Sequence, residues 1–118
     1  MNKKVNASVV NSETSDEITL TFNNIYSRSR NYLAMDDGTF TITSTSKNIA
    51  RVDIHYYSAN GRTYGPQSVT VDRGTFNDDY TDWRAHGILT DSVTFTMDAN
   101  TGRSTRTAIS SIVVYLAY

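Results

Sequence analysis

Apolar and polar residues alternate with a period of two along most of the chain. Ile18, Leu20 and Phe22 lie on one face of an extended segment with threonines on the other, and residues 38–44 and 91–98 repeat this arrangement. Such alternation is typical of half-buried β-strands, and the three- and four-residue spacing of amphipathic helices is almost absent. Further strand-like runs lie at residues 4–10, 31–35, 48–57, 67–72 and 109–118. The pattern predicts about eight β-strands.

The predicted fold class is all-β, an antiparallel two-layer β-sandwich of either jelly-roll or Ig-like topology. A chain of 118 residues is enough for one domain, so residues 1–118 are expected to form a single β-sandwich domain. Residues 1–16, ahead of the first clear alternation, are expected to be a flexible or edge-strand N-terminal segment. Glycines 38, 61, 74 and 102 follow polar residues between predicted strands and are expected to take positive φ in tight turns.

Two stretches of the chain echo each other. In each, a Thr-Phe-Thr strand at 39–41 or 94–96 is followed by a polar turn and then by apolar residues at offsets of three and two. These apolar residues are Ile49, Val52 and Ile54 in the first stretch and Ile109, Ile112 and Val114 in the second. The echo predicts two pseudo-symmetric halves whose apolar residues face the core. The offset of three predicts a β-bulge or bend where each strand begins.

The last predicted strand is apolar on both faces. Its inward set continues to Leu116, while Val113, Tyr115 and Ala117 make the opposite face unusually apolar. The strand is therefore expected to be central in its sheet or covered on both sides. Another subunit lying on the outer side of these three residues would account for the pattern.

Arg51, Asp53 and His55 alternate along one predicted strand and share a face. The apolar residues between them are expected to face the core, so these three are predicted to lie on the outer, solvated face, where cross-strand charge pairing accounts for them. A zinc site would need more ligands than the one further histidine, His86, supplies, and a catalytic triad would need a positioned nucleophile. The alternative interpretation is a flat polar patch that meets a partner.

Charge and composition argue against several classes of function. Eleven Lys and Arg against twelve Asp and Glu leave no basic excess for a nucleic-acid backbone or an anionic membrane. No window approaches the ~20 apolar residues of a membrane span, and no apolar signal-peptide stretch is visible after the first residues. The absence of cysteine removes disulfides and thiolate chemistry. Neither nucleic-acid binding nor membrane insertion is expected.

The stretch 77–89 is predicted to be a long irregular loop that carries any metal site. Its acidic residues supply oxygen ligands suited to calcium, although their spacing fits no EF-hand and turn formation explains them equally well. The calcium candidates are Asn77, Asp78, Asp79 and Asp82. No other cofactor is expected, and no catalytic residue is assigned because the pair of carboxylates that a glycosidase needs in one cleft is not recognisable.

Trp83, the single tryptophan, has two interpretations. In a ligand platform it would grip a sugar ring together with Tyr80, Arg84, Asp78 and Asp79. Tyrosines near strand ends would extend such a platform, and these are Tyr26, Tyr32, Tyr57 and Tyr64. As a structural residue Trp83 would plug one end of the sandwich, which is the interpretation we prefer.

Four segments carry a family resemblance. In chain order they read YLAMDDGTFTITSTSKNIARVDIHYYS, SVTVDRGTF, DWRAHGILTDSVTFTM and RTAISSIVVYLAY. Over residues 30–118 they resemble a β-sandwich module that recurs in secreted and cell-surface proteins of Bacteroides-type gut bacteria and, by extension, of their phages. The resemblance rests on core positions and on the Trp-containing loop. It implies a non-catalytic binding or spacer module in which Trp83 is structural.

The expected function is that of a non-enzymatic structural or display module in a larger assembly, such as a phage decoration or fibre protein or a cell-surface protein. Its expected partners are other subunits or further copies of the chain, and its expected location is a virion or the extracellular cell surface. The alternative is a carbohydrate-binding module that binds a cell-surface glycan through the Trp83 loop. A glycosidase or other hydrolase, the third hypothesis, would need two carboxylates in one pocket.

Overall fold

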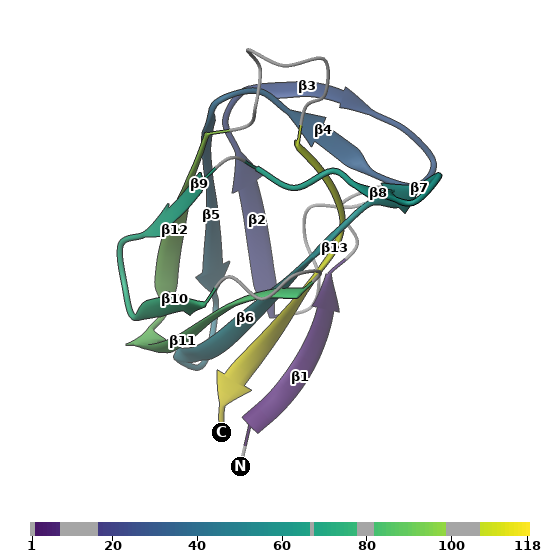
Figure 1. Ribbon diagram of the computed structural model, residues 1–118. Helices are drawn as coiled ribbons and strands as arrows, with labels where there is room; N and C mark the ends of the chain where they lie inside the picture. The colour runs from purple at the N-terminus through teal and green to yellow at the C-terminus, as the bar shows by residue number, and fades with distance from the viewer. Residues whose placement is uncertain (1, 8–16, 67, 78–81, 99–106) are drawn as a thin grey trace.

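A computed structural model of the chain describes residues 2–7, 17–66, 68–77, 82–98 and 107–118. Two antiparallel β-sheets face each other in a sandwich (Figure 1). This arrangement confirms the predicted all-β fold class. Within the described ranges, no helix is long and apolar enough to cross a membrane.

Seven strands form the larger sheet and four form the smaller one. The larger sheet contains β1 (Asn2–Ala7), β3 (Ile25–Arg28), β4 (Leu33–Met35), β6 (Ile49–Tyr56), β10 (Thr75–Asn77), β11 (Asp82–Thr90) and β13 (Thr107–Ala117). Its order is β10-β11-β6-β13-β4-β3, and β1 pairs with β13 as well. The smaller sheet has the order β2-β5-β12-β9 and contains β2 (Ile18–Phe22), β5 (Gly38–Ser44), β9 (Ser68–Val71) and β12 (Ser92–Asp98). A separate hairpin joins β7 (Ser58–Ala59) to β8 (Arg62–Thr63).

The strand pairing is nested in the way that defines a jelly roll. β4 pairs with β13, β5 with β12 and β6 with β11, so the two halves of the chain run antiparallel to each other. The short turn at 72–74 joins β9 to β10 at the innermost position. Successive pairs fall alternately in the larger and the smaller sheet because the doubled ribbon folds over itself. The nesting is that of a jelly roll except at its innermost step, where β9 and β10 lie in different sheets.

The two echoing stretches occupy the centre of both sheets. β5 and β12 pair in the smaller sheet, and β6 and β13 pair in the larger one. The apolar residues of the echo are all buried. The register of β6 against β13 shifts between Ile109 and Ser111 and again between Tyr115 and Leu116, which lies opposite Ile49. The predicted irregularity at both strand entries is thus confirmed.

Aromatic rings form a continuous line through the core. Neighbouring ring centroids lie between 4.6 and 6.3 Å apart along the series Phe22, Phe40, Phe95, Phe76, Trp83 and Tyr56. Phe40 and Phe95 stack at 4.8 Å between the central strands of the smaller sheet, and edge contacts carry the line to the larger sheet. Because each ring removes a large apolar surface from water, this line accounts for much of the stabilisation between the layers.

The sequence predicts an irregular loop over residues 77–89, but the structure has the long strand β11 from Asp82 onward. The loop prediction is therefore wrong for residues 82–89, and residues 78–81 lie outside the described ranges. Alternation is interrupted because the register shifts between His86 and Thr90, where Gly87 and Leu89 have positive φ of 69° and 56°. A bulge of this kind hides a strand from a search for period-two alternation.

The glycine prediction holds at two of the three described positions. Gly61 and Gly74 have φ of 74° and 80°. Gly38 is not among the residues with positive φ, so the expectation that a tight turn requires glycine at this position is wrong. A Cβ there would lie 2.6 Å from the carbonyl oxygen of Asn23, so close approach of the backbone at the corner between the sheets requires glycine. Gly102 lies outside the described residues.

Gly74 and Gly61 offer a matched pair of substitutions. Both have similar positive φ, but a Cβ at Gly74 would lie 2.3 Å from the carbonyl oxygen of His86, while a Cβ at Gly61 would meet nothing within 4 Å. Gly74→Ala is therefore expected to lower the free energy of unfolding by about 2 kcal/mol more than Gly61→Ala. Urea unfolding followed by circular dichroism measures the difference, and equal losses in the two variants would contradict the backbone clash.

Candidate functional site

The predicted calcium and ligand loop is described only in part. Asp78, Asp79 and Tyr80 lie outside the described residues, and of Asp82 the backbone alone is described, as the first residue of β11. Asn77 ends β10. In the described part of the chain, no three His, Asp or Glu side chains gather in a way that would hold a metal ion. These residues stay calcium candidates only, and the expectation that the chain binds no cofactor stays a prediction.

Trp83 lies inside the sandwich. Its ring meets Tyr56 edge-on at 4.6 Å and Phe76 at 5.9 Å. Gly65 lies against it, since a Cβ at that position would be 3.3 Å from the indole ring. With 9% of its surface exposed, Trp83 offers little ring face on which a sugar can stack. This placement agrees with the preferred interpretation of Trp83 as a plug.

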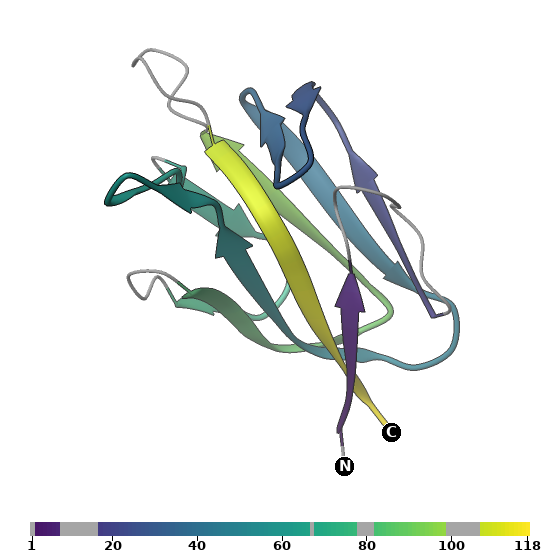
Figure 2. The ribbon, with the colours of Figure 1, turned by 90° about the vertical axis from the view of Figure 1, so that its right-hand side faces the viewer.

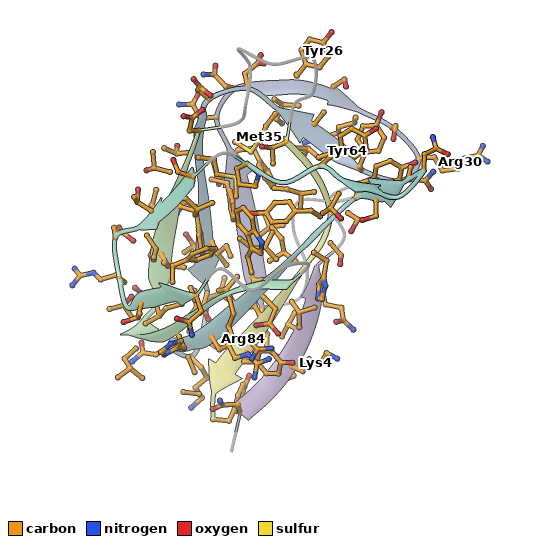
Figure 3. All side chains as sticks on the ribbon, viewed as in Figure 1. Lys4, Tyr26, Arg30, Met35, Tyr64 and Arg84 are labelled. Atoms are coloured by element: carbon orange, nitrogen blue, oxygen red, sulfur yellow. The ribbon has the colours of Figure 1, made fainter. Side chains whose placement is uncertain are left out.

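Arg84 lies on the opposite side of β11, on the outer face of the larger sheet. The cross-strand register aligns Arg84 with Asp53 of β6, and Asp53 with Val113 of β13. Arg51 and Tyr115 form the next row along the same face. Figure 2 looks onto this face, down whose middle β13 runs in yellow, and Figure 3 places Arg84 near the same end of the molecule as Lys4 of β1.

Asp53 is a buried carboxylate held by two arginines. Arg51 donates a hydrogen bond from Nε to Oδ1 at 2.8 Å and one from Nη2 to Oδ2 at 2.6 Å, and Arg84 donates from Nε to Oδ1 at 3.0 Å. The prediction that this row lies on the outer face is confirmed. The expected solvation of Asp53 is wrong, because only 6% of the residue is exposed. The two long arginine side chains reach it from the same strand and from the neighbouring one.

The arginines determine the charge state of this cluster. Burial alone would raise the pKa of Asp53, but the hydrogen bonds from Arg51 and Arg84 outweigh it and hold the pKa below its usual value. The hydrogen bonds to Asp53 in turn raise the pKa of Arg51. A carboxylate stabilised in this way is a poor general base because its proton affinity is low.

The same cluster predicts a loss of stability in acid. A carboxyl group whose pKa is lower in the folded chain than the ordinary value of 3.8 contributes stability above that value, and the contribution disappears as the pH falls through the folded pKa. Between about pH 5 and about pH 2, the wild type should therefore lose more free energy of unfolding than Asp53→Asn. The lowered pKa of Glu17, due first to a hydrogen bond from Lys3, affects both proteins equally and cancels. Parallel pH profiles in urea unfolding would contradict this prediction.

The outer side of β13 is covered largely by side chains of the same chain. Val113 is 8% exposed and lies between Asp53 of β6 and Asn6 of β1. The guanidinium carbon of Arg51 lies 4.5 Å from the centroid of the Tyr115 ring, a cation–π contact. The expectation that this strand is central in its sheet is confirmed, since β13 pairs with β6, β4 and β1. Long polar side chains bury the apolar strand.

The two histidines lie on the outer face in different rows. His55 is aligned with Ser111 of β13, and His86 with Thr75 of β10. His86 Nε2 lies 3.1 Å from Asn77 Nδ2.

Three of the four tyrosines that the sequence places near strand ends form a row. The rings of Tyr32 and Tyr57 lie 4.7 Å apart between centroids, and those of Tyr57 and Tyr64 lie 5.8 Å apart. All three side chains are half-buried. Tyr26 lies apart on β3, at the top of Figure 3, and is 55% exposed. We call Tyr32, Tyr57 and Tyr64 the tyrosine row.

The tyrosine row lies on the other side of the larger sheet from Trp83. Tyr56 points into the core against Trp83, and the next residue, Tyr57, points outward. The sequence identified these tyrosines as candidates but associated them with Trp83. It could not indicate the row itself, because its members come from three segments that long-range pairing brings together.

Comparisons with known proteins gave no match. Neither a protein family, nor a curated protein, nor a solved structure matches this chain. Its function is therefore argued from its own residues.

Proposed function

We propose that the chain is a non-enzymatic structural or display module of a larger assembly at a virion or cell surface. The observation that carries this proposal is the placement of the chain ends relative to the tyrosine row. Asn2 pairs with Ala117, so both ends lie side by side at the bottom of Figure 1. Ala108, at the other end of β13, is hydrogen-bonded to Tyr57 and Tyr64. A strand from Ala108 to Ala117 spans about 30 Å.

This geometry suits display because a module attached at one end presents the opposite end outward. The end of the sandwich that carries both chain ends is tied together by side chains: Glu17 accepts hydrogen bonds from Lys3 of β1 and from Tyr118. The amino groups of Lys3 and Lys47 also lie 5.5 and 5.4 Å from the centroid of the Tyr118 ring. These contacts join β1, the start of β2 and the end of β13, so that tension on either end is shared among three strands.

The ionisable groups support binding in preference to catalysis. Hydrolysis by paired carboxylates needs one carboxyl group with a raised pKa. The two described carboxyl groups with a clear shift, Glu17 and Asp53, both have lowered pKa values. Jelly rolls also build viral capsid proteins and lectins, an analogy at the level of fold that agrees with a surface role.

Fractionation of the source organism tests the proposal. An antibody to the purified chain is used to follow it through culture supernatant, cell envelope, soluble lysate and sedimented particles. A structural module is expected to co-sediment with one particulate fraction at a fixed ratio to its main proteins, through repeated gradient purification. Recovery entirely as a free protein in every fraction would refute the proposal.

The alternative, a carbohydrate-binding module built on the Trp83 loop, loses support from Trp83 itself because the ring is enclosed by the core. Arg84 is also committed to Asp53 through its Nε. The observation that favours carbohydrate binding is elsewhere, in the tyrosine row.

A further inference from the structure

The tyrosine row is an aromatic surface that the hydrophobic core does not use. The core cluster includes Tyr56 and Trp83 but none of the three tyrosines of the row. Tyr57 makes ring contacts with Tyr32 on one side and Tyr64 on the other. The row therefore crosses the outer face of the larger sheet at the start of β13, and each of its rings is partly open to solvent.

Backbone hydrogen bonds hold the row in place. Tyr57 N donates to Ala108 O at 2.8 Å, Ala108 N donates to Tyr64 O at 2.9 Å, and Tyr64 N donates to Tyr57 O at 2.9 Å. Tyr32 is fixed by accepting a hydrogen bond from Ser29 N at 2.9 Å and by preceding β4. A surface fixed in advance loses little conformational entropy when a ligand binds.

Small residues of the larger sheet lie beside the tyrosine row. Ala34 of β4 pairs with Ala108 of β13, and both are buried although β-alternation turns them toward the outer face. Side chains this short leave room for rings to lie low over the sheet. The result is a broad aromatic surface, in contrast to isolated projecting tyrosines such as Tyr26.

The segments that carry the row are positively charged. Residues 26–33 contain Arg28 and Arg30, residues 57–66 contain Arg62, and neither segment contains Asp or Glu. The chain as a whole has a formal net charge of −1. Arg28 and Arg30 are exposed, and Figure 3 shows Arg30 extended from the same end of the molecule as Tyr64. The exposed Arg30 thus lies at the same end of the molecule as the tyrosine row.

We propose that the tyrosine row, with Arg30, forms a binding site for an acidic polysaccharide. The C–H face of a pyranose ring stacks on aromatic rings, and the hydroxyl groups of tyrosine supply hydrogen bonds at the ring edge. Guanidinium groups pair with the carboxylates that alternate along a uronic-acid polymer. Ser58 and Thr63, whose hydroxyl oxygens lie 2.8 Å apart on the β7–β8 hairpin, add polar groups beside Tyr57 and Tyr64.

The test uses a pair of polymers with the same sugar backbone, one with free carboxylates and one with methyl esters. Affinity electrophoresis and calorimetry compare polygalacturonate with its fully methyl-esterified form, and hyaluronate and alginate extend the acidic set. Binding is expected for at least one acidic polymer, with an affinity that falls as salt is raised. Equal binding of the esterified polymer would overturn the assignment of an acidic ligand, and absence of binding to all acidic polymers would overturn the site.

Variants identify the residues involved. Tyr64→Ala and Tyr32→Ala are expected to raise the Kd about tenfold, and Arg30→Glu to raise it severalfold and to weaken its salt dependence. Tyr64→Phe keeps the ring, so it should retain most of the affinity and serves as the probe if Tyr64→Ala fails to fold. Tyr115→Ala is the matched control, because Tyr115 is half-buried on the same sheet face at the other end.

Two further outcomes of these binding measurements would contradict the proposed site or its ligand. An equal loss of affinity in Tyr115→Ala would show that the row is not the site. Tyrosine-dependent binding of a polyproline peptide without binding of any polysaccharide would replace the proposed ligand by a protein segment. Neither outcome bears on co-sedimentation with an assembly, so this inference and the proposed function fail separately.

Discussion

Trp83→Ala is expected to lower the free energy of unfolding by about 3–5 kcal/mol, because the substitution leaves a large cavity in a core that cannot collapse around it. The indole ring is the link between Phe76 and Tyr56 in the aromatic line, and Gly65 lies against its edge. A loss of this size is a large share of the 5–15 kcal/mol that stabilises a typical domain. A loss of binding in Trp83→Ala could therefore arise from lower stability, without any contact between Trp83 and a ligand.

Urea unfolding followed by far-ultraviolet circular dichroism measures this loss, because Trp83 is the single tryptophan and its removal eliminates intrinsic tryptophan fluorescence. Trp83→Phe, which retains an aromatic ring, should recover a substantial part of the stability. Tyr115→Ala serves as the comparison for an aromatic residue on the outer face and should cost less, because Tyr115 is only half-buried. A Trp83→Ala protein as stable as Tyr115→Ala would mean that the ring is not part of the core.

The inward-facing residues could be predicted from the sequence because their signal is local. Alternation placed the residues of β2, β5 and β12 on their buried faces, and the three-residue offsets at Ile49 and Ile109 marked positions where the register of β6 and β13 does shift. Side-chain alternation is a property of single strands, so it needs no knowledge of strand neighbours. The same reasoning failed at β11, where the bulge at Gly87 and Leu89 interrupts the alternation.

The candidate sites could be predicted less completely because they depend on which strands are neighbours. The sequence placed Arg51 and Asp53 on one face, but the burial of Asp53 depends on Arg84 of β11 approaching from the adjacent strand. The tyrosine row likewise requires Tyr32, Tyr57 and Tyr64 to meet across the start of β13. Pairing between segments this far apart is set by the jelly-roll topology, about which alternation carries no information.

The charged cluster around Asp53 and the tyrosine row lie at different ends of the outer face of the larger sheet, and we propose a binding role only for the row. In the cluster, the positive charges of Arg51 and Arg84 are directed at a carboxylate within the chain. Near the row, Arg28 and Arg30 are exposed and their segments contain no carboxylate. Arginine side chains therefore stabilise the sheet at one end, and at the other end Arg30 is the side chain that we propose for contact with an external anion.

Asp53→Ala is expected to lower the free energy of unfolding by about 3 kcal/mol. Removing the carboxylate leaves two guanidinium groups close together over a partly buried apolar strand, and their repulsion adds to the loss of three hydrogen bonds. The side chains of Arg51 and Arg84 are 33% and 44% exposed, so water stabilises them in part and places the expected loss at the lower end of the range for a broken buried ion pair. Urea unfolding at neutral pH measures the effect.

A triple variant separates two contributions to the free energy of unfolding: the destabilisation caused by unpaired arginines and the stabilisation due to the intact cluster. Asp53→Leu combined with Arg51→Met and Arg84→Met replaces the whole group by apolar side chains of similar size, which is often neutral for stability. We therefore expect the triple variant to regain most of the stability that Asp53→Ala loses, since no unpaired charge remains. If instead the triple variant were as unstable as Asp53→Ala, the hydrogen bonds to Asp53 would be specifically required to hold β6 and β11 in register.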